Sequence, residues 1–476
     1  MSKPNKLTQA ALQQTYMSSP GLFYRRAVEE LWPGRAYHHA PYVDAIFYQL
    51  ARMWAGETNR LIINIPPRHY KSTIVSVVTV AMLLGIDPSL KIMVVSYSKE
   101  LVVELHNLTR DLMQSDFYKC VFPATKIKIG KNTEGVFLTT KNGGRRAVSA
   151  GGSATGFGAD IIIVDDLMKP EDALSETVRT KMNAYVQNTL LSRIENKRYG
   201  KMIVIQQRLH PDDTTGYLLE HGTWDHLKLS AVATTKESIP IGNGEFFERE
   251  PGDALDPERE DIETLGQLRK EVGEFTFSAQ WQQEPVLPGG NMLKLEQFQR
   301  YDMLPPRHYF EYYVQSWDPA VTAAETSDYS VCTTWGKRGD YYYLIHVLRI
   351  KLEYPDLEKM VWHHLKKFDP KLVIFERSHI GSALYAAYEN SSLSMTLHDG
   401  PVCFACITPK VSKVERAAVQ SVKVEQGRLF LPTEAEWLPA LENELRQFPN
   451  GKYDDQVDSI VQFLMAMDYP IAGVNC

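Results

Sequence analysis

The stretch from Leu61 to Thr73, LIINIPPRHYKST, constrains the fold more than any other part of the chain. It begins with a short apolar run, interrupted at Asn64, that is typical of a strand buried on both faces of a parallel sheet. Two prolines end this run, and Lys71 then opens a segment long and apolar enough for a helix. Strand, tight loop, Lys-Ser/Thr and helix are the layout of a phosphate-binding P-loop.

In a P-loop, backbone N–H groups hold phosphate, the lysine reaches the β- and γ-phosphates, and the hydroxyl binds Mg²⁺. The motif is incomplete, because Ile65 and Tyr70 stand where G-x-x-x-x-G-K-[ST] has glycine. Taken alone, the pattern also fits a surface lysine after a proline turn. The P-loop interpretation predicts these nucleotide-binding residues: Arg68, His69, Lys71, Ser72 and Thr73.

A second motif, 94 residues after Lys71, supports the P-loop. The run GGSATGFGAD leads into four apolar residues, 161–164, which end in Asp165 and Asp166. This is the Walker B pattern, in which a central strand carries carboxylates to the side of the P-loop. We predict that Asp165 holds Mg²⁺ through Ser72 or a water molecule, and that Asp166 orients the attacking water.

Strands and helices alternate around these motifs. Lys91–Tyr97 predicts a buried strand and Lys99–Gln114 an amphipathic helix. Met202–Gln206 predicts another strand, and the polar residues at its tip, Gln206 and Gln207, are candidates for sensing the γ-phosphate. The alternation predicts an α/β domain with a parallel sheet covered on both faces.

The pattern changes after Glu284–Pro306, a stretch rich in proline and glycine that predicts a linker. Three β-rich runs joined by short connections then predict antiparallel strands, and helices and strands alternate after them. The three runs are Tyr312–Trp317, Ser330–Trp335 and Tyr341–Ile350. Three hairpin strands followed by alternating helices and strands are the order of a ribonuclease-H-like fold.

The acidic residues of this second half fit the same fold. Two-metal phosphodiester cleavage needs several carboxylates that hold two ions about 3.5–4 Å apart. Asp318 and Glu376 each end a strand and Asp455 opens the last helix, so the three can meet at one edge of the sheet. Asp458 shares a helix face with Asp455. We predict Asp318, Glu376 and Asp455 as catalytic metal ligands for two Mg²⁺ or Mn²⁺ ions, Asp458 as a further ligand, and Asp454 as a ligand acting mainly at the helix start.

Composition sets few further limits. The chain has 476 residues, 44% of them hydrophobic and 23% charged, which is ordinary for a globular protein of two or three domains. It contains no apolar run long enough for a membrane span and no apolar core of a signal peptide near residue 1. Five cysteines point to a reducing compartment. The net charge of −6 does not indicate DNA binding, but basic segments at 126–146 and 410–428 are candidates for DNA contact or for solvated faces.

Several stretches resemble the large terminase subunit of tailed bacteriophages. In the first half they are PPRHYKST, IIIVDDLMKPEDALS, VIQQRLHPDDTTGYLL and FSAQWQQEPVLPGG. In the second half they are TPKVSKVERA and LRQFPNGKYDDQVDSIVQFL. The resemblance implies a P-loop ATPase domain at 1–285, a linker at 286–306 and a ribonuclease-H-like nuclease domain at 307–476. The family often has glycine at the position of Tyr70.

The resemblance also implies a function. It predicts ATP-driven translocation of double-stranded DNA into a procapsid and metal-dependent cutting of concatemeric DNA, with ATP and Mg²⁺ at the motor site. The implied partners are double-stranded DNA, a small terminase subunit, the portal protein and other copies of the chain in a ring, expected to be a pentamer. The implied location is the host cytoplasm and the portal vertex, without a membrane.

Three points stay open at this stage. The family uses an arginine finger from a neighbouring subunit, for which Arg145, Arg146 and Arg193 are candidates, whereas the TGFGAD stretch offers Phe157. A helicase-nuclease of repair or recombination is an alternative function, although no strand-separation motif is found. The missing glycines also allow a nuclease or portal-docking subunit with a vestigial ATP site.

Overall fold

The computed structural model describes residues 6–34, 37–152, 156–285, 292–320, 329–392, 396–397, 400–409, 411–451 and 453–468. The chain divides into two compact units. The first unit is Met1–Leu268 with Thr276–Val286, and the second unit is Arg269–Phe275 with Leu287–Cys476.

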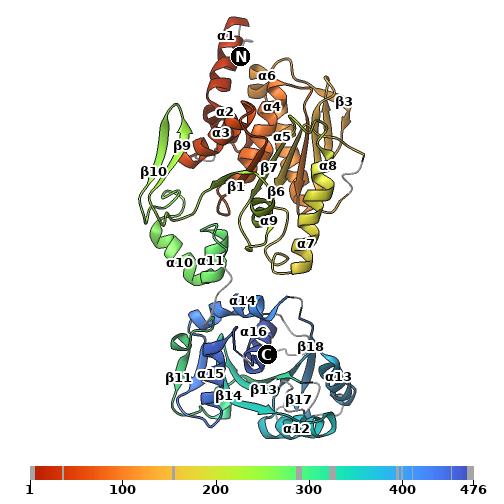
Figure 1. Cartoon of the computed structure of the whole chain (residues 1–476), viewed down its shortest axis with the longest axis vertical. Helices are drawn as coiled ribbons and strands as arrows, with labels where there is room; N and C mark the ends of the chain where they lie inside the picture. Colours follow the sequence, from red (N-terminus) through yellow and green to blue (C-terminus); the bar gives the residue numbers. More distant parts are fainter. Residues whose placement is uncertain are drawn as a thin grey trace. The chain divides into compact units, whose positions relative to one another are not determined.

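In the described part of the chain, the first unit contains an eight-stranded sheet (Figure 1). The neighbouring strands β5, β2, β6, β7, β1 and β8 run parallel to one another. On the other side of β5, β4 and then β3 continue the sheet in antiparallel pairing. In spatial order the strands are β3 (Ile127–Asn132), β4 (Val136–Thr139), β5 (Gly144–Ser149), β2 (Lys91–Ser96), β6 (Ile161–Asp165), β7 (Lys201–Gln206), β1 (Arg60–Asn64) and β8 (Asp225–Lys228).

Both faces of this sheet are buried. On β1, Leu61 and Ile63 pack into one core while Ile62 packs into the other, as expected from the alternation of side chains along a strand. The helices on the first face are α1 (Lys6–Ser18), α2 (Pro20–Leu31), α3 (Pro41–Trp54), η1 (Thr73–Thr79), α4 (Val80–Ile86), α5 (Lys99–Gln114) and α6 (Asp116–Val121). Those on the second face are α7 (Glu176–Ala184), η2 (Tyr185–Leu190), α8 (Leu191–Arg193) and α9 (Thr214–His221). The predicted parallel sheet covered on both faces is confirmed.

The remaining elements of the first half lie beside this sheet or follow it. A hairpin of β9 (Glu237–Gly242) and β10 (Glu245–Arg249) packs against α3 through Ile239. After the hairpin come α10 (Ile262–Val272) and α11 (Glu274–Gln280). No helix in the described ranges has the length and apolar content needed to cross a membrane.

In the described part of the second unit, a seven-stranded sheet carries the predicted antiparallel hairpins (Figure 1). In spatial order its strands are β11 (Gln299–Tyr301), β19 (Leu429–Pro432), β14 (Tyr341–Ile350), β13 (Ser330–Arg338), β12 (Tyr312–Asp318), β15 (Leu372–Glu376) and β18 (Cys403–Ile407). β15 and β18 extend the sheet in parallel from β12. Within the stretch predicted as a linker, β11 pairs with β19.

Helices cover both faces of the second sheet. On one face, α12 (Tyr354–Phe368) and α13 (His379–Ser392) pack on Trp317 and Phe375. On the other face lies α16 (Asp455–Ala466), where Ser459 hydrogen-bonds Thr333 and the Ser316 carbonyl and Phe463 stacks on Trp335. The other elements are η3 (Leu295–Gln297), η4 (Arg307–Tyr309), β16 (Thr396–Leu397), β17 (Gly400–Pro401), α14 (Lys413–Glu425) and α15 (Leu438–Gln447).

Buried neutral histidines make the stability depend on pH. Burial lowers the pKa to about 4 for His69 and His364 and to about 3 for His106, against about 6.5 in an unfolded chain. Between about pH 6.5 and the folded pKa values these histidines bind more protons in the unfolded chain, so their contribution to the free energy of unfolding falls as pH falls. We expect a lower urea midpoint at pH 5 than at pH 7, and a smaller difference in His106→Leu. An unchanged pH dependence in that variant would contradict the assignment.

Two candidate active sites

The loop after β1 bends through two residues with positive φ. Arg68 has φ 63° and Tyr70 has φ 56°, a region that costs an ordinary L-residue about 1–2 kcal/mol. Left-handed residues in a turn direct successive backbone N–H groups toward one concave side, which is a common way to bind an anion. The helix formed by η1 and α4 follows directly and adds the positive end of its dipole. The loop therefore has a shape suited to phosphate although Tyr70 stands at a glycine position.

The predicted ligand His69 turns its side chain into the protein. It is 1% exposed, its Nδ1 lies 2.9 Å from the Pro67 carbonyl oxygen, and its ring packs edge-on against Tyr42. Arg68 is exposed. The His69 side chain holds the shape of the loop, so a contact from this residue to a nucleotide would have to come from its backbone.

Lys71 meets the end of β6. Its Nζ lies 2.9 Å from Oδ2 of Asp166 and 3.5 Å from Oε1 of Gln207. The backbone N–H of Gln207 donates to the other carboxylate oxygen of Asp166 at 3.3 Å. The structure thus brings Lys71, Asp166 and Gln207 together. Gln206 is the last residue of β7, where its carbonyl accepts a hydrogen bond from Asn64.

Asp165 is buried between two hydroxyls of the helix that follows the loop. Ser72 Oγ donates to its Oδ1 at 2.9 Å and Ser76 Oγ to its Oδ2 at 2.6 Å. Burial and the neighbouring charge of Asp166 raise the pKa of Asp165 to about 6, against the effect of these hydrogen bonds. The structure thus brings Asp165 and Ser72 together, and their predicted role in binding Mg²⁺ stays a prediction. Ser76 was not predicted, although a serine four residues after Ser72 in an apolar run was a usable signal.

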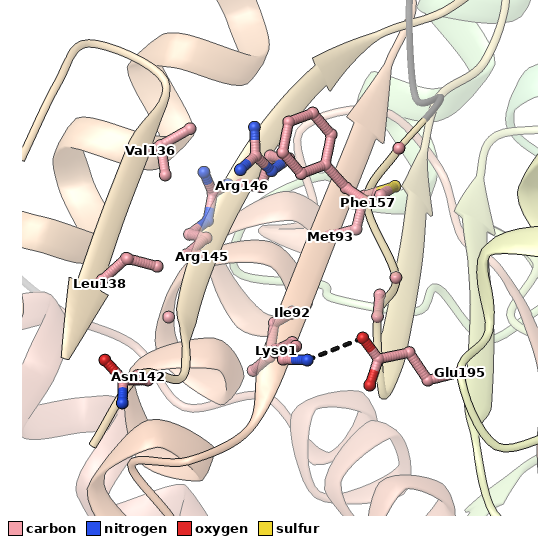
Figure 2. Close-up of a pocket in the computed structure, with 14 residues that line it drawn as sticks. Lys91, Ile92, Met93, Val136, Leu138, Asn142, Arg145, Arg146, Phe157 and Glu195 are labelled. Carbon is pink, nitrogen blue, oxygen red and sulfur yellow. Dashed lines mark hydrogen bonds and ion pairs between the residues drawn. The ribbon is translucent and has the colours of Figure 1, made fainter. Parts of the chain in front are cut away.

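Of the three candidate arginines, Arg145 is enclosed in its own subunit. It is 1% exposed, its Nη2 donates to the Ser76 carbonyl at 3.4 Å, and burial lowers its pKa to about 9. Arg146 lies beside a cavity of about 280 Å³, where its guanidinium is 3.4 Å from the centre of the Phe157 ring (Figure 2). Arg193 ends α8 and is half-buried. The burial of Arg145 is unsuited to the predicted arginine finger, for which Arg146 and Arg193 stay candidates.

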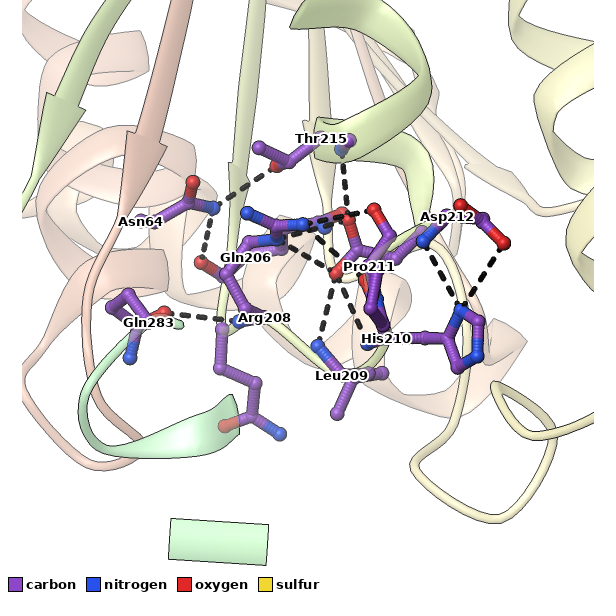
Figure 3. Close-up of polar contacts among 12 residues, drawn as sticks. Asn64, Gln206, Arg208, Leu209, His210, Pro211, Asp212, Thr215 and Gln283 are labelled. Carbon is purple, nitrogen blue, oxygen red and sulfur yellow. Dashed lines mark hydrogen bonds and ion pairs between the residues drawn. The ribbon is translucent and has the colours of Figure 1, made fainter. Parts of the chain in front are cut away.

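A polar network fixes the chain after β7 (Figure 3). Arg208 Nε lies 3.0 Å from both carboxylate oxygens of Asp213, which also caps α9. The backbone N–H of Arg208 donates to Gln283 Oε1. The side-chain amide of Asn64 donates to the Gln206 carbonyl and to the Thr215 hydroxyl. This network holds the segment that carries Gln207 to Lys71 and Asp166.

In the second unit, strand register places two predicted acids together. β12 and β15 run parallel with Trp317 opposite Phe375, and both of these side chains face α12. The next residue on each strand, Asp318 and Glu376, therefore faces the opposite side, where α16 lies. Asp455 is the first residue of α16.

The helix acids complete the cluster. Asp455 and Asp458 are 4% and 1% exposed. Burial raises the pKa of Asp318 well above its usual value, and the charges of Glu376, Asp458 and Asp455 raise it further. These four of the five predicted carboxylates therefore lie close enough to interact.

Two cations lie among these carboxylates. Lys413 contacts Asp458 and lies 2.8 Å from Asp454, and Arg416 Nη2 lies 3.3 Å from Asp458 and 3.7 Å from Glu376. The pKa of Asp458 is raised to about 6 by burial, although Lys413 and Arg416 act to lower it. Asp454 is the N-cap residue of α16, at the predicted helix start, but its side chain makes no capping hydrogen bond and pairs with Lys413.

The donor set fits a hard divalent cation, because it consists of carboxylates concentrated at one point. In the described residues, however, no three acidic, histidine or cysteine side chains are spaced as ready ligands. Lys413 and Arg416 supply the positive charge that balances the acids in this arrangement. In the sequence both residues stand out only as part of the basic segment 410–428.

Comparison with known proteins finds a family model that matches part of the second half of the chain. Residues 315–467 match the family model described as "Terminase RNaseH-like domain". No curated protein matches the chain in sequence.

The solved structures extend the likeness to nearly the whole chain. One crystal form of the large terminase from a thermophilic bacteriophage is 10% identical, with a TM-score of 0.54, and the match covers 92% of this chain and 100% of that one. Another form is 11% identical, with a TM-score of 0.51 over 91% and 100%. The same terminase in complex with ADP is 11% identical, with a TM-score of 0.50 over 90% and 99%. Residues 315–467 therefore match a terminase RNaseH-like domain, and the chain is similar in fold to a large terminase over nearly its whole length.

Proposed function

We propose that this chain is the large subunit of a phage terminase, which uses ATP to move double-stranded DNA into a procapsid and cuts concatemeric DNA with a metal-dependent nuclease. One observation carries the proposal: a single chain combines a P-loop joined to Walker B carboxylates with a carboxylate cluster in a terminase RNaseH-like domain. The terminase of the thermophilic bacteriophage was solved with ADP and with ATP-γ-S, which supports nucleotide binding by the shared fold.

In the motor site, the residues have separable roles. The loop backbone and Lys71 bind the β- and γ-phosphates. Ser72, Thr73 and Asp165 hold Mg²⁺, and Ser76 orients Asp165 through its 2.6 Å hydrogen bond. Gln207 is placed to sense the γ-phosphate, because it contacts both Lys71 and Asp166.

In the nuclease site, Asp318, Glu376 and Asp455 bind two Mg²⁺ or Mn²⁺ ions together with Asp458. Such ions supply charge neutralisation and an activated water when bound. Lys413 and Arg416 balance the carboxylates through their contacts with Asp458. Asp454 is held by Lys413 at the margin of the cluster.

We place the ATPase domain at 1–285, the linker at 286–306 and the nuclease domain at 307–476. We further propose that the subunit works as a ring, expected to be a pentamer, with a small terminase subunit and the portal protein as partners. Its location would be the host cytoplasm and, transiently, the portal vertex.

One assay of the purified chain with DNA tests the proposal, with ATP and Mn²⁺ supplied separately. We expect phosphate release that needs Mg²⁺ and ATP, and DNA cutting that needs Mn²⁺ but not ATP. ATP-dependent strand separation would favour the repair helicase-nuclease. Cutting without any ATP hydrolysis would favour the subunit with a vestigial ATP site.

Asp166 is predicted to be the catalytic carboxylate of the motor. Asp166→Asn should bind ATP nearly normally but hydrolyse it at least about 10²-fold more slowly, the usual scale for a positioned base. Phosphate release and nucleotide binding would be measured side by side, with Asp172→Asn at an exposed acid as the control.

Hydrolysis by Asp166→Asn at the parent rate would move the role to another acid. Glu171 would then be the candidate. Glu195 is the other acid to consider, but it supports the role less well, because it pairs with Lys91 at the start of β2 whereas Asp166 follows the end of the adjacent strand β6.

A further inference from the structure

Tyr70 is held in its left-handed conformation by a side chain from a distant part of the first unit. The tyrosine is half-buried and packs against the main core of this unit. The guanidinium of Arg259 lies 4.3 Å from the centre of its ring. An arginine over an aromatic face is attracted by the negative charge of the ring surface.

Arg259 is itself fixed in place. Its Nε lies 3.6 Å from Oδ2 of Asp256, which is 4% exposed, and its backbone N–H donates to the Asp256 carbonyl at 3.0 Å. His38 lies 3.9 Å from Asp256 and 2.8 Å from Glu258. The turn 256–259 thus presents the guanidinium from a supported position, so that it can restrain Tyr70.

The loop is restrained from its other side as well. His69, next to Tyr70, packs against Tyr42 of α3 and is 1% exposed. Side chains therefore fix both residues immediately before Lys71. A glycine at position 70 would reach φ 56° without strain, whereas a tyrosine needs such contacts to stay there.

We propose that Arg259 is a positioning residue for the ATP site: by clamping the ring of Tyr70, it maintains the phosphate-binding shape that glycine provides in the common form of the motif. The clamp rests on the proposed ATP-binding function. Arg259 touches Tyr70 and not Lys71 or Asp166 in the contacts described, so its effect is expected on nucleotide affinity more than on the chemical step.

The test compares Arg259→Ala with Arg259→Lys in the full chain. We expect Arg259→Ala to raise the KM for ATP and the Kd for ADP about tenfold, with kcat within about threefold of the parent, in line with the strength of a cation–π contact. Arg259→Lys keeps a cation near the ring, so its KM for ATP and its Kd for ADP should lie between those of the parent and those of Arg259→Ala. Arg198→Ala, which removes an arginine beside the exposed ring of Tyr199, is the matched control and should change neither constant.

A second variant separates the clamp from general damage to the fold. In a Tyr70→Gly background, Arg259→Ala should change the Kd for ADP by less than about twofold, because the residue it restrains is gone. An unchanged Kd for ADP when Arg259→Ala is made in the parent would overturn the clamp. The same tenfold loss of ADP affinity in the parent and in the Tyr70→Gly protein would also overturn it. A parent protein that binds no nucleotide would instead overturn the proposed function.

Discussion

Lys71→Ala is expected to abolish ATP hydrolysis while leaving metal-dependent DNA cutting detectable. Lys71 is the cation of the loop, is 8% exposed and contacts Asp166 and Gln207, so no other side chain in these contacts can replace its charge. Removing a positioned charge from such a site costs roughly 10²–10³-fold in rate, and loss of phosphate binding adds to this. Phosphate release with ATP and nicking of supercoiled DNA with Mn²⁺ would be measured on the same preparation.

The control for this variant is Lys181→Ala, at an exposed lysine of α7. It should keep both activities. Loss of both activities in a folded Lys71→Ala protein would contradict separable sites, because the P-loop and the carboxylate cluster belong to different compact units.

Much of the first unit could be predicted from the sequence because its strands are buried on both faces. Such strands appear as short apolar runs, and β1, β2, β6 and β7 begin or end within one residue of the predicted runs. The strands β3 to β5 were missed, because this antiparallel edge is rich in charged residues and β3 is largely exposed. The segment had been interpreted only as a basic patch.

The loop after β1 was only partly predictable from the sequence. Its motif could be recognised from Lys71 and Ser72. The position of the Tyr70 ring, however, depends on contact with Arg259, which is 189 residues away in the sequence. No local pattern predicts such a contact. His69 was predicted to bind the nucleotide from its place in the motif, and its packing against Tyr42 directs its side chain into the protein.

In the nuclease site, the acids were predictable and their counter-charges were not. Asp318 and Glu376 each end a strand, and the fold order makes these strands neighbours. Lys413 and Arg416 come from α14, and only the three-dimensional packing of this helix on α16 brings their side chains to the acids. Asp454 stands at the helix start as expected, but its carboxylate pairs with Lys413 and does not cap the helix.

Replacement of Asp318 or Asp455 by Asn, or of Glu376 by Gln, is expected to reduce DNA cutting by at least about 10²-fold. This is the scale of losing one positioned charge at a reaction centre, and ATP hydrolysis should continue. Each change removes one ligand and leaves the other carboxylates around too little positive charge. Nicking of supercoiled DNA would be followed over a range of Mn²⁺ concentrations. Asp340→Asn, in the exposed turn between β13 and β14, is the control and should cut like the parent.

Asp454→Ala should be the mildest change among the predicted ligands. Its carboxylate is 35% exposed and pairs with Lys413, whereas Asp458 is 1% exposed and contacts both Lys413 and Arg416. Loss of Asp454 leaves Lys413 its contact with Asp458, so the balance of charge inside the cluster changes little. A structure with Mn²⁺ bound by Asp454 and not by Asp455 would reverse this order. Ions bound far from Asp318 would remove the site from this edge of the sheet altogether.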